Sequence, residues 1–233
     1  MNGKRTPKVH GLKYELDIPA RQLRLSCRQP AHGFAPFAGN MDRESDRLNG
    51  WLTEYFGEPA VWSENVETGF PDDLESPGPT LISTATLAAV AEWFSLELDE
   101  VRQRFRANLE IDGVPAFWED RLYGSHGGTV SHGSTVPQGS TVPFRIGNLH
   151  FQGVNPSQRC VVPTRHPASG QVLEGFAKRF AAKRAEQLPA WAAANRFDHY
   201  YRLAVNTRCQ GGAGAELLTG DAVEILTSAH GGP

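Results

Sequence analysis

Cys160 is the residue of this sequence best placed to bond a soft metal or attack an electrophile. It stands between Arg159 and the β-branched pair Val161-Val162, just before a loop that Pro163 opens. A neighbouring guanidinium favours the thiolate, which is the form that ligates metals and acts as a nucleophile. A lone cysteine beside apolar residues also serves as a small core residue. The pattern by itself therefore leaves both roles open.

Two further segments carry groups suited to anions. Ser83, Thr84 and Thr86 offer hydroxyls and backbone N–H groups at the start of a predicted helix, where a phosphate binds favourably. Simple helix capping is the alternative role. Arg106 and Asn108 end a stretch with two guanidiniums and an amide at a helix-to-strand junction. Such a set can grip a phosphate or a polar heterocycle, although solvated surface arginines look the same in a sequence.

Hydrophobic periodicity predicts the elements that position these residues. Helical spacing of apolar residues predicts helices over 42–56, 87–94, 99–106 and 172–187, the second with Ser83 or Thr84 as its N-cap. Alternation and β-branched runs predict strands over 9–16, 21–28, 108–113, 144–151, 159–162, 202–207 and 222–226, with a Gly147-Asn148 hairpin turn in the fourth. Many short strands with a few helices favour a mainly β, α+β fold. We therefore expect a closed or partly closed β-barrel with helical decorations rather than a doubly wound parallel sheet.

Composition excludes several classes of protein. The 233 residues carry 26 acidic and 23 basic side chains, so no strong field attracts nucleic acid. No apolar run approaches the roughly 20 residues that span a bilayer. The three cysteines form no paired motif and follow no signal peptide, which predicts a cytoplasmic protein without a membrane partner. The histidines show no zinc spacing, and residues 124–143, with two Gly-Ser-Thr-Val-Pro repeats, are predicted to form a surface loop.

A series of short motifs runs along the chain in a specific order. These are 104–109, Glu119-Asp120, Ile146-Gly147, Arg159-Cys160, 167–170 and 220–223. In that order they resemble the MOSC domain, the molybdenum cofactor sulfurase C-terminal domain. The segment 81–87 is similar to the serine-rich link that precedes it in the family. The resemblance implies a partial N-terminal β-barrel portion over 1–80 and a MOSC-type β-barrel over 81–233, with 123–143 as a low-complexity insertion.

The resemblance also implies a cofactor and a set of site residues. Cys160 matches the cysteine that ligates molybdenum, and Arg159 matches the arginine beside it, while Gln158 stands where a serine is usual. Arg106 and Asn108 match the outer residues of an Arg-Pro-Asn motif that holds the pterin, with alanine in place of the proline. Residues 83, 84 and 86 fall on the segment that contacts the molybdenum cofactor in relatives.

The relatives suggested are the mitochondrial amidoxime reducing component and its bacterial counterparts. They imply an oxidoreductase that reduces small N-hydroxylated or N-oxide-type compounds. No haem or iron–sulfur cysteine pattern is present, so a separate electron-transfer protein is expected as partner. Two alternatives stay open: a sulfur carrier with a Cys160 persulfide, and a non-catalytic ligand-binding barrel in which Cys160 is only packed.

Two expectations concern the extent of the chain. Pyridoxal phosphate belongs to a separate domain of the sulfurases that 233 residues do not accommodate, so this cofactor is not expected. The opening residues 1–7 resemble the middle of the family's N-terminal portion. We therefore expect a chain shortened at its N-terminus, with weaker cofactor binding because relatives hold the cofactor partly through the missing stretch.

Overall fold

The computed structural model describes residues 3–28, 34–66, 70, 73–124, 140–211 and 214–226. The chain divides into two compact units. The smaller unit comprises Met1–Phe70 and Cys160–Glu174, and the larger comprises Pro71–Arg159 and Gly175–Pro233. The predicted repeat loop falls mostly on residues 125–139, outside the described residues. Helices combine with mostly antiparallel strands, which confirms the mainly β, α+β class.

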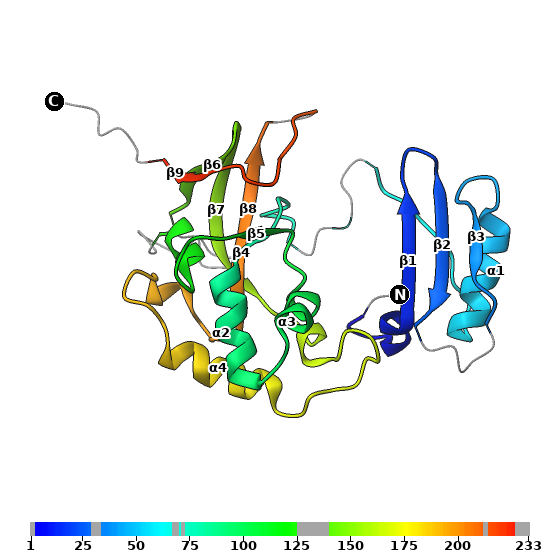
Figure 1. The fold of residues 1–233 in the computed structure, drawn as a ribbon, viewed down its shortest axis with the longest axis horizontal. Coiled ribbons are helices and arrows are strands. Elements are labelled where there is room, and N and C mark those ends of the chain that lie inside the picture. The colour runs from blue at the N-terminus through cyan, green and yellow to red at the C-terminus, as the bar shows by residue number, and fades with distance from the viewer. Residues whose placement is uncertain are drawn as a thin grey trace, which may run out of the picture. The chain divides into compact units, whose positions relative to one another are not determined.

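The smaller unit is a three-stranded antiparallel sheet covered by one helix. Strands β1 (Leu12–Asp17), β2 (Gln22–Cys27) and β3 (Phe37–Asn40) lie in that order, and α1 (Ser45–Phe56) follows them. Alternate residues of β2 point to α1, as the period of two predicts, so Leu23 and Leu25 are buried with Leu48 and Leu52. Figure 1 shows α1 beside β3 and away from β1. The strand predicted from residue 9 begins only at residue 12, because the 3-10 helix η1 (Pro7–Gly11) precedes it.

The larger unit is built on a six-stranded sheet that curls into a half-barrel. Its order is β5-β4-β8-β7-β6-β9, in which only the neighbours β4 and β5 are parallel. The strands are β4 (Leu81–Ser83), β5 (Leu109–Ile111), β6 (Val142–Ile146), β7 (Leu149–Gln158), β8 (Arg202–Gln210) and β9 (Val223–Ile225). The predicted Gly147-Asn148 hairpin is confirmed, with Gly147 at φ 55°. Buried apolar side chains such as Leu81, Phe144 and Val205 fill the core of this sheet.

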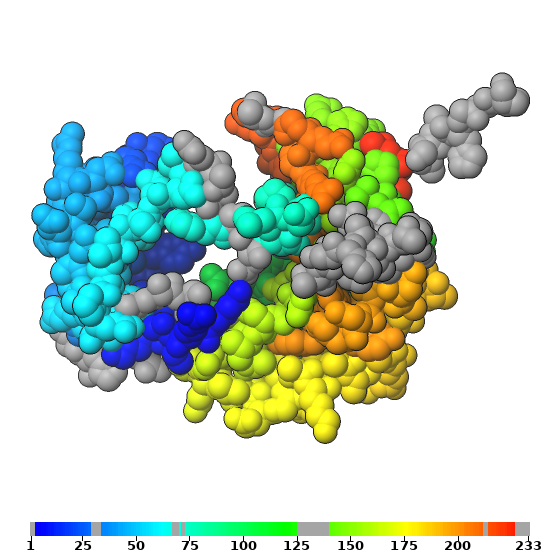
Figure 2. Space-filling view, turned by 180° about the vertical axis from the view of Figure 1, so that it is seen from behind, coloured from blue at the N-terminus to red at the C-terminus, as the bar shows by residue number. Residues whose placement is uncertain are grey.

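Three helices gather at one end of that sheet (Figure 1): α2 (Thr84–Phe94), α3 (Leu98–Phe105) and α4 (Phe176–Glu186). Phe94 of α2 stacks on Phe176 of α4 with ring centroids 4.2 Å apart. The first turn predicted for α4 is absent because Gly175 adopts a left-handed φ of 70°. Figure 2 shows α4 as part of the yellow surface of this unit. The apolar positions of the 172–187 segment predict a helix with its basic residues on the outer face, but Arg184 is buried.

The strand predicted over 159–162 is wrong. β7 ends at Gln158, and Val161 takes helical angles of φ −69° and ψ −17°. The short 3-10 helix η4 (Val162–Thr164) follows, since Pro163 has no N–H to lose and its fixed φ suits a first helical turn. Cys160 therefore lies after a strand rather than in one. In the described ranges, no helix has the length and apolar character needed to cross a membrane.

Candidate functional site

Arg159 fastens the end of β7 to the end of α3. Its guanidinium donates to the carbonyl oxygen of Phe105 and, through Nη1, to Ser157 Oγ at 3.2 Å. The guanidinium carbon lies 5.5 Å from the centre of the Phe105 ring. The Arg159 backbone N–H donates to the Tyr201 carbonyl at 3.1 Å. Two predicted site segments, distant in sequence, therefore meet where Arg159 reaches the residue preceding Arg106.

Arg106 ends α3 in a left-handed conformation with φ 53°. For a residue other than glycine, this backbone conformation costs about 1 kcal/mol. The Arg106 side chain is exposed, and in the part of the chain that the structure describes its guanidinium has no hydrogen-bond or ion-pair partner. The turn therefore holds a free cation at a strained position, an arrangement that stability alone does not favour.

Asn108 fixes the turn that follows. Its Oδ1 accepts from the Thr80 N–H at 2.9 Å and from Thr80 Oγ1 at 3.0 Å. Its backbone N–H donates to the Thr80 carbonyl at 3.1 Å. The amide Nδ2 forms no hydrogen bond with any described residue and so keeps two donors for a ligand. The side chain is thus oriented by its oxygen and open at its nitrogen.

A cavity of about 230 Å³ adjoins this turn. It is lined by Ile82, Leu87, Arg102, Ala107, Asn108 and Glu110. Arg102 and Glu110 form a two-point ion pair, with Nε to Oε2 at 2.8 Å and Nη2 to Oε1 at 2.9 Å. This pair lowers the pKa of Glu110, so the carboxylate is charged but compensated. The cavity is smaller than the roughly 300–1,000 Å³ of drug-sized ligand sites, so it accommodates only part of a large cofactor.

Ser83 and Thr86 use their hydroxyls inside the protein. Ser83 Oγ caps α2 by accepting from the Thr86 N–H at 3.1 Å and donates to Thr86 Oγ1 at 2.8 Å. Thr86 Oγ1 in turn donates to Glu119 Oε2 at 3.1 Å. All three side chains are buried. Thr84, by contrast, is half-buried and bonds Glu110 Oε1 at 2.8 Å, beside the cavity.

Glu119 and Asp120 anchor this buried network. Burial raises the pKa of Glu119 to about 7, and the charge of Asp120 adds to the effect. Asp120 pairs with the guanidinium of Arg184 and accepts from the Tyr123 hydroxyl at 2.6 Å. Arg184 also lies over the rings of Phe117 and Phe197, at 4.3 and 5.1 Å. The network is therefore a structural support beneath the start of α2.

Cys160 belongs to the smaller unit. Its side chain is half-exposed, and Sγ accepts a hydrogen bond from the Val162 N–H at 3.5 Å. The following loop is ordered around His166, whose Nδ1 accepts from the N–H groups of Ala168 and Ser169 at 3.3 and 3.2 Å. The Cys160 residue is thus partly buried and lies beside the backbone of the η4 turn. Across the described ranges, no three His, Cys, Asp or Glu side chains group to hold a metal ion.

The larger unit therefore brings together Arg159, Arg106 and Asn108, with Thr84 at the neighbouring cavity. Ser83 and Thr86 point inward, and Gln158 is an exposed residue at the end of β7 that pairs with Arg202 in β8. The sequence analysis does not predict the Arg102–Glu110 ion pair or the contact of Asn108 with Thr80. The only sequence feature that points to the ion pair is the opposite charge of residues 102 and 110, because no sequence pattern shows which residue of a helix contacts which residue of the next strand.

A comparison with protein families finds one whose model matches the larger part of the sequence. The MOSC domain matches residues 80–224, more than half of the chain. The chain belongs to the MOSC domain family. The matched range includes every candidate site residue from Ser83 to Cys160. A search of curated proteins finds no match to the chain. The MOSC family is associated with the molybdenum cofactor, so this domain is compatible with that cofactor.

Proposed function

We propose that this MOSC protein binds the molybdenum cofactor and reduces small N-hydroxylated or N-oxide-type compounds, with Cys160 as the molybdenum ligand. The observation that carries the proposal is the bond from the Arg159 guanidinium to the Phe105 carbonyl, which joins two of the segments that the family resemblance assigns to the cofactor. Cys160 follows Arg159 directly in the chain.

The free groups in the larger unit fit the anionic and heterocyclic parts of such a cofactor. Arg106 supplies a guanidinium that no described residue pairs with, and Asn108 supplies two amide donors from Nδ2 that no described residue accepts. A guanidinium matches a phosphate in two-point geometry, and an amide matches the polar edge of a pterin. The hydroxyls of Ser83 and Thr86 do not take part, because both are committed to the buried network. From this segment the proposal uses Thr84 and the N–H groups at the start of α2.

The sulfur of Cys160 fits a soft metal. Thiolates ligate metals of this class, and the Cys160 side chain is only partly buried. The Val162 N–H that donates to Sγ stabilises negative charge on the sulfur. When bound, the cofactor supplies two-electron chemistry in which oxygen moves to or from a small substrate.

The protein residues then have distinct tasks. Cys160 fixes the metal, and Arg106 with Asn108 binds the organic part and orients it. Arg159 keeps the β7 end and the α3 end in register through its contacts with Phe105 and Ser157. Its guanidinium is therefore a positioning group in this proposal. Electrons come from a separate electron-transfer protein.

The test is reduction of an N-hydroxyamidine by protein from a host that makes the cofactor, with electron-transfer partners supplied. We expect activity in the wild type and none in Cys160→Ala. Cys209→Ala is the matched control, because Cys209 is an exposed thiol of β8 in the larger unit, and it should keep full activity. Equal activity in both variants contradicts the role of Cys160.

Mass spectrometry of the same samples separates the sulfur-carrier alternative. That alternative requires a mass increase of one sulfur atom on Cys160 and no reduction of the substrate. A wild-type protein that is folded but has no activity, no molybdenum and no added sulfur would be a ligand-binding barrel without catalysis.

A further inference from the structure

One edge of the three-stranded sheet in the smaller unit lies along β1. The sheet order is β1-β2-β3, and no described residue pairs with β1 on the side away from β2. Such an edge presents unpaired N–H and C=O groups to other strands. The residues Tyr14 and Leu16 are 65% and 43% exposed, respectively. We propose that this edge pairs with β1 of a second copy of the chain, in an antiparallel register centred on Tyr14.

The hydrogen-bond pattern identifies which backbone groups are free. The Arg28 N–H donates to the Gly11 carbonyl at 2.8 Å, in the same register as the β1–β2 pairs. Hydrogen-bonded and non-hydrogen-bonded pairs alternate in an antiparallel ladder. The backbone groups of Lys13, Glu15 and Asp17 therefore face β2. Those of Tyr14 and Leu16 face outward, toward the free edge.

The pairing of β2 with β3 leads to the same conclusion. The Met41 N–H donates to the Arg21 carbonyl at 2.9 Å, in register with the pair Leu23–Gly39. Odd-numbered residues of β2 consequently bond to β3, and even-numbered ones bond to β1. The partners of even-numbered β2 residues are the odd-numbered residues of β1. The backbone groups of Tyr14 and Leu16 therefore have no strand partner among the described residues.

The edge also leaves an apolar strip uncovered. Tyr14 and Leu16 lie opposite Leu25 and Leu23, on the face of the sheet that α1 covers. The buried cluster beneath α1 contains residues of β2 and β3 but none of β1. A second copy related by a twofold axis perpendicular to the sheet places its own strip beside this one, between the two α1 helices. The contact then completes a core that one copy leaves open.

Charged side chains on the opposite face of the sheet determine the register of the proposed pairing. Lys13 and Glu15 lie there, with their charged atoms 3.7 Å apart in one chain. Centred on Tyr14, the pairing sets Lys13 opposite the second copy's Glu15 and the reverse. A pairing centred on Lys13 or on Glu15 places that residue opposite its own copy, so that like charges face each other. A pairing centred on Leu16 places Glu15 opposite Asp17 of the second copy, which is also a pair of like charges. Opposite charges across a strand pair stabilise it and like charges destabilise it, so only the Tyr14 register is complementary throughout.

The number of backbone bonds in this register is small. Tyr14 exchanges two bonds with its copy, and each Leu16 N–H faces the Leu12 carbonyl of the other chain. That carbonyl already accepts from Arg28 Nε at 3.1 Å, and the Leu12 N–H already donates to the Val9 carbonyl. Four inter-chain bonds and a short overlap predict a reversible, concentration-dependent dimer rather than an obligate one.

Sedimentation of the full chain over a range of concentrations tests the proposal. The wild type should move from monomer to dimer as concentration rises. Lys13→Glu should weaken the dimer about tenfold, because both cross-strand ion pairs become repulsive. Glu15→Lys should do the same for the same reason. An equal mixture of the two variants should dimerise again, because one copy then carries only acidic and the other only basic side chains at positions 13 and 15. Recovery in the mixture is specific to this register.

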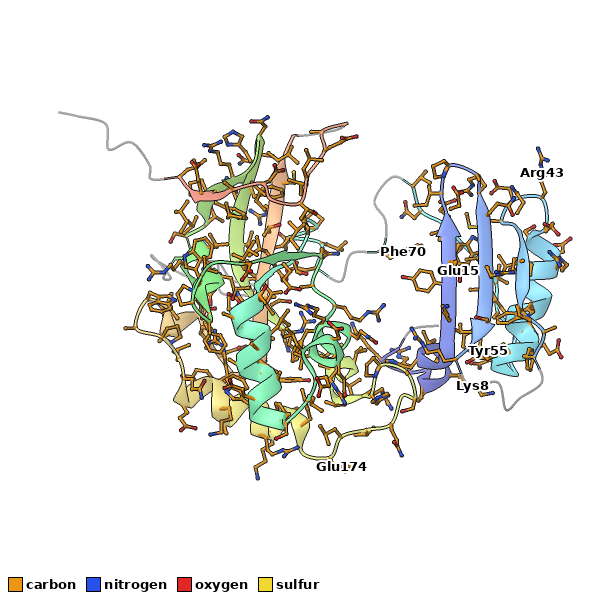
Figure 3. The ribbon with its side chains drawn as sticks, in the orientation of Figure 1. Lys8, Glu15, Arg43, Tyr55, Phe70 and Glu174 are labelled. Carbon is orange, nitrogen blue, oxygen red and sulfur yellow. The ribbon has the colours of Figure 1, made fainter. Side chains whose placement is uncertain are left out.

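Two further variants sharpen the test. Tyr14→Pro removes an outward N–H without touching the bonds to β2, and it should abolish dimerisation. Arg43→Glu is the charge-matched control, since Arg43 follows β3 at the other end of this sheet (Figure 3), and it should dimerise like the wild type. Thermal unfolding of each variant checks that it folds.

Hydrogen exchange provides a readout that needs no variant. The amides of Tyr14 and Leu16 should exchange fast in dilute protein and more slowly as concentration rises. The proposal is overturned if the wild type stays monomeric throughout, if Lys13→Glu dimerises as the wild type does, or if the mixture fails to recover. Protection of both amides at every concentration also overturns it, because another segment of the same chain would then cover the edge.

Discussion

Two polar clusters of the larger unit are built from similar residue types and differ in what they leave free. In the buried cluster, Ser83, Thr86 and Glu119 form a continuous chain of hydrogen bonds, and Asp120 pairs with Arg184. In the open cluster, at the end of α3, Arg106 and the Asn108 amide nitrogen stay unbonded among the described residues. Hydroxyls and arginines near a helix end are therefore structural where they are buried and available to a ligand where they are exposed.

The largest effect is expected from breaking the buried ion pair. Arg184→Met leaves the Asp120 carboxylate buried without its cation, which costs about 3–5 kcal/mol in the free energy of unfolding. Urea denaturation measures this loss. Adding Asp120→Asn to Arg184→Met should recover a large part of it, because no uncompensated charge remains. A loss below about 1 kcal/mol for Arg184→Met would mean that the pair does not support α2.

The second-largest effect is the pH dependence of the free energy of unfolding that Glu119 causes. The pKa of Glu119 is about 7 in the folded protein and 4.5 as its ordinary value, so the folded state binds the extra proton between these values. Its contribution to stability is complete below about pH 4.5 and is lost as pH rises through about 7. The loss is at most about 3 kcal/mol. Glu119→Gln carries no titrating group, so its advantage over the wild type in urea denaturation should grow between about pH 5 and pH 8.

A constant difference between wild type and Glu119→Gln across that range would contradict the buried, protonated state of this carboxyl. The other titrating groups are present in both proteins, so most of their contribution to the pH dependence cancels in the difference.

A smaller effect tests the cap of α2. Ser83→Ala removes the acceptor of the Thr86 N–H and should lower the free energy of unfolding by about 1–2 kcal/mol. Ser95→Ala, at the exposed end of the same helix, should change it by less than about 0.5 kcal/mol. Equal effects of the two substitutions would remove the distinction between the capping hydroxyl and a surface one.

The smallest effect on stability is expected in the open cluster, where function should suffer most. Arg106→Gly relieves a left-handed residue and leaves stability unchanged or raised by up to about 1 kcal/mol. It should nevertheless lower molybdenum content. Ser95→Gly, at φ 52° in the same helix-ending position, is the matched control and should retain molybdenum. A stable Arg106→Gly protein with full molybdenum content would show that this cation does not bind the cofactor.

Local rules account for the parts of the fold that could be predicted. The period of two in β2, the helical spacing in α1 and α2 and the Gly147 turn are properties of neighbouring residues. The prediction of a strand over 159–162 was wrong because Pro163 favours a helical turn, and this preference outweighs the strand preference of the β-branched residues Val161 and Val162. The later start of α4 follows from the backbone of Gly175, whose left-handed angle no apolar pattern reveals.

The candidate site could be predicted only through family motifs. These motifs single out Arg106, Asn108 and Arg159, but the bond from Arg159 to the Phe105 carbonyl joins residues 54 apart in sequence and follows from the tertiary fold. The same limit applies to Ser83 and Thr86. Their sequence allows both capping and ligand binding, and only the position of Glu119, on another segment, turns their hydroxyls inward.

Molybdenum analysis of the purified chain tests the central claim most directly. Protein from a host that makes the cofactor should carry molybdenum, Cys160→Ala should carry none, and Cys209→Ala should match the wild type. A wild-type protein free of molybdenum, or a Cys160→Ala protein that carries as much as the wild type, would contradict the assignment of Cys160 as the metal ligand.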